Sequence, residues 1–325
     1  MRIVITGGAG FLGTRLARKL LERGSLVDAA GTSRPLRQLV LLDITAAAVD
    51  DPRVTAVAGD LADPAVIGRV VTADTDSIFH LAAVVSGQAE AEFDTGMRVN
   101  LDATRALLER CRKLNKPPTF VFTSSLAVFG GKLPDPVPDD APLTPQTSYG
   151  AQKAIGELLV YDMTRKGFID GRSLRLPTVT VRPGKPNKAA SSFASGIIRE
   201  PLSGIDAVCP VPPQTEIWIT SPRQVIDNLI VGHDVAAAKF PGDTRSVNVP
   251  GLRISVAAMV EALRRVAGDA VAARVKWRVD PAIDRIVRTW PPNFAPRLGP
   301  ALGMVADTNF DEIVRAYMAD DMPRA

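Results

Sequence analysis

The sequence predicts an α/β protein built around a doubly wound parallel sheet, with a smaller lobe in its C-terminal part. Short β-branched and aliphatic runs alternate with helical patterns through the first half of the 325 residues. These runs are continuously apolar, which is typical of parallel strands covered by helices on both faces. We expect strands at Ile3–Thr6, Leu39–Leu42, Val54–Ala58, Ser77–Leu81, Thr119–Thr123 and Ser173–Leu176.

Helical patterns fill the intervals between the expected strands. Leucines recur every four residues from Leu12 to Leu20 and place an apolar stripe on one face of the first helix. Further helices are expected over Asn100–Leu114 and Tyr149–Tyr161. This alternation predicts a Rossmann-type domain over residues 1–182.

The second half of the chain is richer in proline and glycine, which makes its regular structure harder to predict. One helix is clear around Val256–Val266. A return segment at about 225–250 is expected to rejoin the main sheet. Residues 183–219 and 251–325 are expected to form the smaller, substrate-binding lobe.

Composition and charge disfavour several classes of protein. The net charge of +4 is spread along the chain without a basic block, so no nucleic-acid partner is expected. The two cysteines, Cys111 and Cys209, and the two histidines, His80 and His233, have no metal-ligand spacing, so no metal is expected. No apolar run approaches the roughly 18 residues of a membrane helix. We expect a cytoplasmic protein with no membrane partner.

A glycine-rich turn joins the first strand to the first helix. Gly7, Gly10 and Gly13 allow the backbone to turn tightly and approach a pyrophosphate, whose charge the helix N-terminus stabilises. The strand before and the helix after favour a dinucleotide site over an ordinary turn. Phe11 and Leu12 belong to the same expected site.

Asp43 ends the second strand, where a carboxylate can accept hydrogen bonds from the hydroxyls of the adenosine ribose. The same charge repels a 2′-phosphate, so NAD is expected rather than NADP. A solvated strand-end carboxylate is the alternative interpretation. Arg34 and Arg37, in an inserted loop before Asp43, argue for NADP because either can pair with a 2′-phosphate.

Tyr149 and Lys153 lie four residues apart and therefore share one face of a helix. A neighbouring ammonium favours the phenolate and makes the tyrosine a usable general base. Such a pair also occurs on helix surfaces. Here it follows Thr123–Gly130, a strand end in which Ser125 can place a hydroxyl beside the phenol.

Together with His80–Ala83 and Arg98–Leu101, these motifs resemble the extended short-chain dehydrogenase/reductase superfamily from residue 1 to about 185. The resemblance implies an NAD-dependent oxidoreductase in which Tyr149 is the catalytic base. It also implies that Lys153 lowers the pKa of that base and binds the nicotinamide ribose, and that Ser125 bonds the substrate oxygen. It implies further cofactor contacts from Leu81, Ala82, Ala83 and Asn100. Asp60 and Leu61 end the third strand and can receive the edge of the adenine, and Pro177 is a further expected cofactor residue. His80 is expected to be a structural residue that bonds to the backbone at the end of its strand.

Members of the superfamily often form homodimers through the two helices that begin here near Asn100 and Tyr149, so a homodimer is expected. Many members act on nucleotide sugars and have an asparagine after the sixth strand, where this chain has Arg175–Thr178. Dehydratases have acidic residues after the catalytic serine or threonine, where this chain has Leu126 and Ala127. Both departures disfavour a nucleotide-sugar substrate.

The segments Arg182–Pro201 and Trp218–Arg223 instead resemble the D-erythronate dehydrogenase subgroup, as does the inserted loop. This resemblance implies that NAD oxidises the C2 hydroxyl of a four-carbon sugar acid to a 2-keto acid. A small aldonate needs hydroxyl-binding groups and a cation for its carboxylate. The candidates are Lys185, Asn187, Lys188, Ser191, Ser192 and Arg223.

Two other functions stay open. A nucleotide-sugar epimerase uses the same three residues but retains its NADH. A non-catalytic dinucleotide sensor shares the fold, but it has no need of the intact Ser125, Tyr149 and Lys153.

Overall fold

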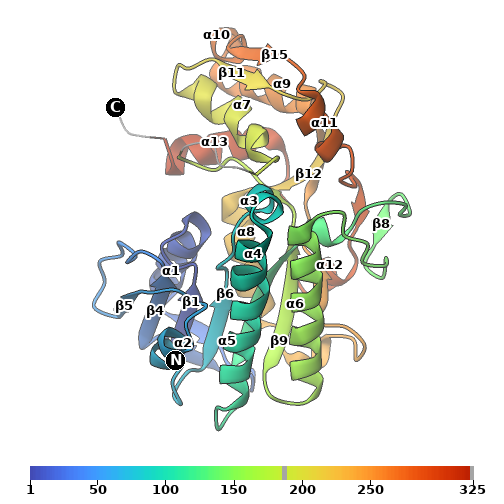
Figure 1. Cartoon of the computed structure of the whole chain (residues 1–325). Coiled ribbons are helices and arrows are strands. Elements are labelled where there is room, and N and C mark those ends of the chain that lie inside the picture. The colour runs from blue at the N-terminus through green and yellow to red at the C-terminus, as the bar shows by residue number, and fades with distance from the viewer. Residues whose placement is uncertain (185–188, 323–325) are drawn as a thin grey trace.

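A computed structural model of the protein describes residues 1–184 and 189–322. Within these residues, the centre of the molecule is a seven-stranded parallel sheet with the strand order β13-β9-β7-β6-β1-β4-β5 (Figure 1). The expected doubly wound sheet is confirmed, and β7 and β9 are longer than predicted. The strands are β1 (Arg2–Thr6), β4 (Gln38–Asp43), β5 (Val54–Ala58), β6 (Ser77–His80), β7 (Thr119–Ser125), β9 (Asp170–Leu176) and β13 (Ser246–Asn248).

The chain order of the strands creates a switch point between β1 and β6. From β1 the chain passes outward through β4 to β5 and then returns to β6 on the other side of β1. The connections on either side of this point leave in opposite directions, which opens a crevice at the carboxyl ends of the strands. The glycine-rich turn after β1 lies at this edge.

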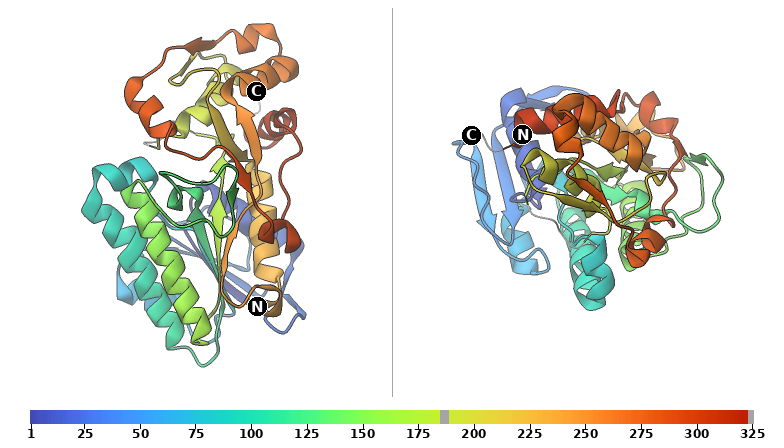
Figure 2. Two further views of the ribbon diagram at one scale, coloured as in Figure 1. Left: turned by 90° about the vertical axis from the view of Figure 1, so that its right-hand side faces the viewer. Right: turned by 90° about the horizontal axis from the view of Figure 1, so that it is seen from above.

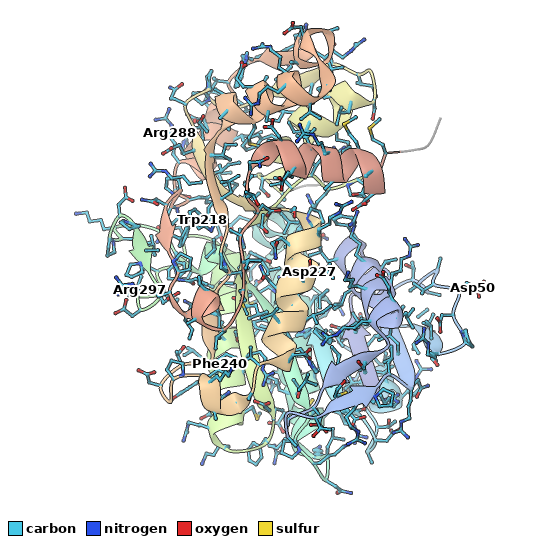
Figure 3. The ribbon with its side chains drawn as sticks, turned by 180° about the vertical axis from the view of Figure 1, so that it is seen from behind. Asp50, Trp218, Asp227, Phe240, Arg288 and Arg297 are labelled. Atoms are coloured by element: carbon cyan, nitrogen blue, oxygen red, sulfur yellow. The ribbon has the colours of Figure 1, made fainter. Side chains whose placement is uncertain are left out.

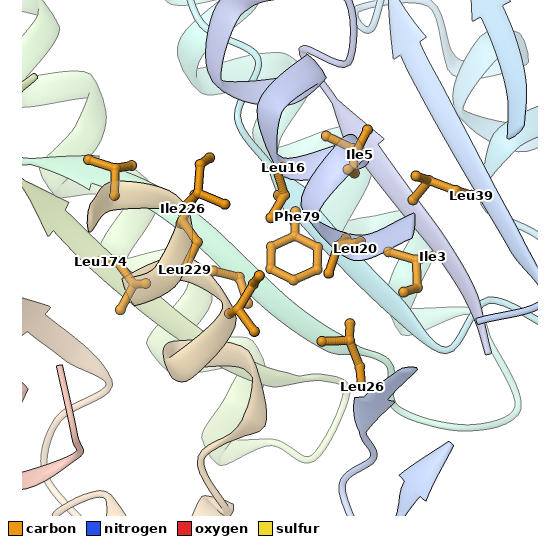
Figure 4. Close-up of a cluster of buried hydrophobic side chains, with 14 of the residues drawn as sticks. Ile3, Ile5, Leu16, Leu20, Leu26, Leu39, Phe79, Leu174, Ile226 and Leu229 are labelled. Carbon is orange, nitrogen blue, oxygen red and sulfur yellow. The ribbon is translucent and has the colours of Figure 1, made fainter. Parts of the chain in front are cut away.

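Helices cover both faces of the sheet (Figure 2). Side chains alternate along β1: Ile3 and Ile5 belong to one core and Val4 to the other. The first core packs against α1 (Phe11–Arg23) and α8 (Pro222–Asp234), and Figure 4 shows Leu16 and Leu20 of α1 beside Phe79. The second core packs against α2 (Pro64–Val70), α5 (Ala103–Arg112) and α6 (Ser148–Arg165).

A smaller lobe with its own hydrophobic core lies above the carboxyl edge of the sheet (Figure 1). Its elements are α7 (Ser192–Leu202), β11 (Ala207–Cys209), α9 (Val256–Ala267), α10 (Asp269–Ala272), β15 (Val275–Trp277), α11 (Pro281–Val287) and α13 (Phe310–Asp320). The three-stranded sheet of β10 (Thr178–Val179), β12 (Glu216–Thr220) and β14 (Leu252–Ser255) connects it to the main domain. In Figure 3, Trp218 of β12 lies at this junction, above Asp227 of α8.

Short elements complete the described fold. They are β2 (Ser25–Val27), β3 (Ser33–Pro35), α3 (Ser86–Ala91), α4 (Phe93–Gly96), a π-helical turn at Met97–Asp102, a 3₁₀ turn at Leu126–Val128, β8 (Val137–Pro138), a 3₁₀ turn at Ala237–Lys239, β16 (Phe294–Ala295) and α12 (Leu298–Ala301). In the part of the chain described, no helix is both long enough and apolar enough to cross a membrane.

Candidate active site

The glycine turn packs too tightly for any side chain. A Cβ at Gly13 would lie 2.0 Å from the carbonyl oxygen of Gly7, and Gly7 itself has a φ of 73°. Gly10 is the N-cap of α1 and provides no side-chain hydrogen bond to the first turn of the helix. The N–H groups of that turn, which includes Phe11 and Leu12, thus face a surface that a pyrophosphate can approach.

The strand end of β6 closes one side of this turn. A Cβ at Gly7 would lie 2.8 Å from the nitrogen of Ala82, so the segment Leu81–Ala83 packs directly on the glycine turn. Thr6 fixes the contact: its carbonyl oxygen accepts from the nitrogen of Leu81 at 3.1 Å, and its hydroxyl accepts from that of Ala82 at 3.3 Å. The structure therefore brings these two sequence-predicted parts of the cofactor site together.

Asp43 lies at the end of β4 and points toward the glycine turn. Its carboxylate accepts hydrogen bonds from the backbone nitrogens of Ala9, at 3.0 Å, and Ile44, at 2.8 Å. Arg37 directly precedes the opposite end of the strand, where its backbone nitrogen donates to the carbonyl oxygen of Met1. At 3.3 Å per residue, Arg37 is roughly 20 Å along the chain from Asp43. Arg34 pairs with Asp28 in the β2–β3 hairpin. Neither arginine lies where a 2′-phosphate beside Asp43 would sit.

Asp60 and Leu61 follow β5 and have different surroundings. A hydrogen bond from the nitrogen of Ala62 and an ion pair with Arg98 lower the pKa of Asp60. Leu61 is buried in the core under α2 and α5. Its side chain packs there, while Asp60 and Arg98 form a half-exposed polar pair.

Asn100 is buried in the π-helical turn between α4 and α5. Its side chain exchanges hydrogen bonds with the backbone of Val84, at 2.9 and 3.2 Å, and donates to the amide oxygen of Gln152 at 2.8 Å. It therefore ties the segment after β6 to α6. The polar atoms of the Asn100 side chain are thus hydrogen-bonded within the protein.

Tyr149 and Ser125 are brought together by the packing of two chain segments. Thr147 caps α6 by accepting from the nitrogen of Gly150 at 3.1 Å. Ser125 caps the 3₁₀ turn after β7 by accepting from the nitrogen of Ala127 at 3.1 Å. A Cβ at Gly150 would lie 2.1 Å from the carbonyl oxygen of Ala127, so only glycine allows this approach.

The phenol of Tyr149 is held largely away from water. Burial raises its pKa to about 12, while a hydrogen bond with Ser125 acts in the opposite direction. Burial disfavours the phenolate, so ionisation near neutral pH requires a nearby positive charge.

Lys153 lies one turn along α6 and supplies that charge. Its side chain is 2% exposed, and its ammonium donates to the carbonyl oxygen of Thr123 at 2.8 Å. The nitrogen lies 4.6 Å from the ring centre of Phe122 and 5.7 Å from that of Tyr149. Burial lowers its pKa to about 7, opposed by the carboxylate of Glu157.

His80 has no free nitrogen. Its Nδ1 is 2.7 Å from the hydroxyl of Thr6, and its Nε2 is 2.8 Å from that of Thr104. Burial lowers its pKa to about 3, with a smaller contribution from Lys153. The side chain is therefore a neutral structural group, although it bonds to hydroxyls and not to the backbone as expected.

The predicted substrate residues are found in three different situations. Lys185, Asn187 and Lys188 lie outside the described residues. Ser191 and Ser192 are half-buried at the start of α7. Arg223 is exposed and makes a bidentate ion pair with Asp320, at 2.6 and 2.7 Å, so its charge is already matched.

Arg182 was not predicted as a site residue. Its half-buried guanidinium has no hydrogen-bond or ion-pair partner among the described residues, and burial together with Arg199 lowers its pKa. Its backbone is fixed, because its nitrogen donates to the hydroxyl of Ser195 at 3.0 Å and its carbonyl oxygen accepts from Arg199 at 2.8 Å. No sequence signal separates Arg182 from the other cations nearby.

The path of the chain connects this arginine with the catalytic edge. Leu176 pairs with Ser125 in the register of β7 and β9, so the buried Pro177 comes directly after the strand position beside the serine. β10 then carries the chain toward Arg182 and the smaller lobe.

A dinucleotide site beside an ionisable phenol allows a proton and a hydride to leave the same alcohol carbon. The fold and the site thus define a dinucleotide-dependent oxidoreductase. The chain belongs to the NAD dependent epimerase/dehydratase family, whose model matches residues 3–218. Its cofactor is NAD, which fits the glycine cradle and the carboxylate of Asp43.

Relatives of high identity match nearly the whole chain. It is 58% identical to a D-erythronate dehydrogenase from Cupriavidus necator, over 98% of both proteins. It is 43% identical to a D-erythronate dehydrogenase from Haemophilus influenzae, over 99% of this chain and 100% of the relative. A solved structure from Agrobacterium tumefaciens, described as a nucleoside-diphosphate-sugar epimerase, has a TM-score of 0.91 and 44% identity, over 98% of this chain and 94% of that one.

Proposed function

We propose that this protein oxidises the C2 hydroxyl of D-erythronate to 2-dehydro-D-erythronate with NAD. The observation that carries the proposal is the full-length identity of 58% to a D-erythronate dehydrogenase. The convergence of Ser125, Tyr149 and Lys153 supports it, because alcohol oxidation needs a base at this place.

The proposed mechanism assigns one task to each of the three side chains. The phenolate oxygen of Tyr149 removes the proton of the C2 hydroxyl, and the hydroxyl of Ser125 holds the substrate oxygen. The ammonium of Lys153 favours the phenolate. When bound, NAD would supply the hydride acceptor for C2, so that loss of one proton to Tyr149 and one hydride from C2 leaves a ketone.

We propose that NAD is held by chain segments at the carboxyl edge of the sheet, on both sides of the switch point. Gly7, Gly10, Phe11, Leu12 and Gly13 would bind the pyrophosphate, and Asp43 the adenosine ribose. Lys153 would bind the nicotinamide ribose. The remaining proposed cofactor residues, some of them acting by packing behind the site, are Asp60, Leu61, Leu81, Ala82, Ala83, Asn100 and Pro177.

We propose that the lobe of residues 183–219 and 251–325 binds the substrate, and that a cation at its border binds the carboxylate. Arg182 is the candidate that the contacts favour, because its charge is unmatched in the described structure while that of Arg223 is paired. Lys185 and Lys188 follow within a few residues and remain candidates, with Asn187, Ser191 and Ser192 for the hydroxyls.

We further propose a homodimer formed by α4, α5 and α6. Large apolar side chains are exposed there on neighbouring helices: Phe93 is 57% exposed, Ile155 41% and Leu158 63%. Burial of such side chains against a second copy is favourable.

We infer a cytoplasmic location from the chemistry of the cofactor and of the cysteines. Cys111 and Cys209 are free and buried, as is usual in a reducing compartment.

A nucleotide-sugar epimerase is the second candidate, and the relative from Agrobacterium tumefaciens is the observation that favours it. Incubation of the enzyme with NAD and a panel of four- to six-carbon aldonates, with UDP- and dTDP-sugars in parallel, separates the candidates. We expect NADH absorbance at 340 nm with D-erythronate and no conversion of the nucleotide sugars. Epimerised sugar without net NADH would replace the proposal, and binding of NAD without any turnover would favour the sensor.

A further inference from the structure

A buried ion pair lies behind the three catalytic side chains. Glu157 is 3% exposed and Arg175 is 6% exposed. The Glu157 carboxylate accepts from Nε of Arg175 at 3.0 and 3.1 Å and from its Nη2 at 2.7 Å. Nη1 of Arg175 also donates to the side-chain oxygen of Asn248 at 3.2 Å, and the guanidinium carbon lies 4.9 Å from the ring centre of Phe129. The network therefore fixes α6 against β9 and β13.

A further hydrogen bond connects this ion pair with the end of β7. The hydroxyl of Ser124 donates to Oε1 of Glu157 at 2.5 Å. Ser124 stands between Thr123, whose carbonyl oxygen holds Lys153, and Ser125, whose hydroxyl bonds to Tyr149. Both catalytic contacts are thus made by the immediate neighbours of the residue that Glu157 holds.

The carboxylate of Glu157 also acts on Lys153, because its negative charge raises the pKa of the buried ammonium against the effect of burial. The two residues are one turn apart on α6, and a buried ammonium is costly unless a negative charge lies near it. Within the described part of the chain, the other titratable or charged groups around Lys153 do not provide one. Tyr149 on α6 is neutral until it acts, His80 on β6 is neutral, and Arg175 on β9 is itself a cation.

We propose that Glu157 is a positioning residue for the dehydrogenation: it fixes the end of β7 through Ser124 and supplies the negative charge that keeps Lys153 protonated. The effect of Glu157 on turnover rests on the proposed function, whereas its effect on the protonation of Lys153 does not. Since Lys153 acts through its charge, Glu157 acts on the reaction through Lys153 without touching the substrate.

The test is Glu157→Gln, which keeps the shape and an acceptor for Ser124 but removes the charge. Lysine labelled with ¹³C at Cε reports the titration of Lys153 in the free enzyme by NMR, assigned with Lys153→Met. We expect the midpoint of Lys153 to fall by about one pH unit or more. We expect kcat with D-erythronate, measured at pH 9, to fall by about tenfold or more. A pKa lowered by one unit reduces the protonated fraction of Lys153 about tenfold at that pH.

Two further variants make the result decisive. Asp162→Asn removes the same charge from the exposed side of α6, where Asp162 pairs with Arg165, and should leave the Lys153 midpoint unchanged. Glu157→Gln leaves Arg175 buried without its partner, so the double variant Glu157→Gln, Arg175→Gln removes both charges if the single variant does not fold. It should show a smaller downward shift, because the loss of the Arg175 cation partly offsets the loss of the Glu157 carboxylate.

An unmoved midpoint in a folded Glu157 variant would overturn the inference, as would a kcat within twofold of the wild-type value. A shifted midpoint in an enzyme that does not oxidise D-erythronate would instead leave the role of Glu157 standing and refute the proposed function.

Discussion

The ammonium of Lys153 lies 5.7 Å from the ring centre of Tyr149 and donates to the carbonyl oxygen of Thr123 at 2.8 Å. One side chain thus joins the proposed base on α6 to the end of β7 that bears Ser125. The arrangement explains why a phenol whose pKa burial raises to about 12 can serve as a base: the compensating charge is fixed beside it.

Tyr149→Phe removes the ionisable oxygen and keeps the ring. We expect turnover to fall by about 10²–10⁴, the range typical of losing a general base, with NAD affinity and melting temperature near the wild-type values. Steady-state kinetics and NAD titration by calorimetry measure these quantities. Turnover within a few-fold of the wild type would refute the role of Tyr149.

Lys153→Met should change the pH dependence of stability. Burial lowers the pKa of Lys153 to about 7 in the folded protein, from an ordinary value of about 10.5 in the unfolded chain. Between these values the unfolded state binds more protons, so the free energy of unfolding of the wild type rises with pH, by up to about 1.4 kcal/mol per unit. The variant lacks this contribution. Urea denaturation at pH 7 and 9 should show a wild-type gain that the variant does not share; parallel curves would contradict the burial of a charged lysine.

Asp43→Ala should relax the choice of cofactor. Its carboxylate lies beside the glycine turn and would repel a 2′-phosphate, so the ratio of kcat/KM for NAD to that for NADP should fall by about tenfold or more. Arg37→Ala is the matched control and should leave the ratio unchanged, since Arg37 lies at the other end of β4. A loss of NADP use in the Arg37 variant would show that the arginine reaches the cofactor.

Arg182→Met should raise the KM for D-erythronate about tenfold or more, because a charge-assisted bond to a carboxylate contributes about 1.5–3 kcal/mol. NAD affinity should not change. Arg223→Met provides the comparison: its guanidinium pairs with Asp320, so its loss should leave KM within about twofold. The reverse order of effects would assign the carboxylate to Arg223.

Leu158→Asp should separate the proposed homodimer, because it places a charge on the exposed apolar face of α6. Light scattering after gel filtration should give half the wild-type mass. Val305→Asp introduces the same charge at another exposed apolar residue and should leave the mass unchanged. A wild-type protein that is already a monomer would refute the dimer.

The sequence was informative wherever one local pattern has one physical meaning. The apolar runs predicted the sheet, and the glycine spacing placed a turn that the structure shows to be too tight for a Cβ at Gly13. The sequence was less informative about the hydrogen-bond and ion-pair partners of polar side chains. Nothing in the sequence indicated that the Asn100 side chain forms hydrogen bonds with Val84 and Gln152. Nor did it indicate the ion pair between Asp320 and Arg223, because such contacts join residues far apart in the chain.

The network of Glu157 and Arg175 illustrates the same limit. Glu157 stands one turn after Lys153, and its spacing alone is that of many surface pairs on helices. Its significance depends on burial and on Ser124, Arg175 and Asn248, which three different strands contribute. Patterns of periodicity report which face of an element is buried, but not which polar groups meet there.

The most direct test of the proposed reaction uses D-erythronate carrying deuterium at C2. We expect the enzyme to form one equivalent of deuterated NADH for each 2-keto acid, measured by mass spectrometry of the released cofactor and product. The Tyr149→Phe variant should form almost none. Undeuterated NADH, or deuterium kept in the sugar acid with no release of reduced cofactor, would contradict oxidation at C2.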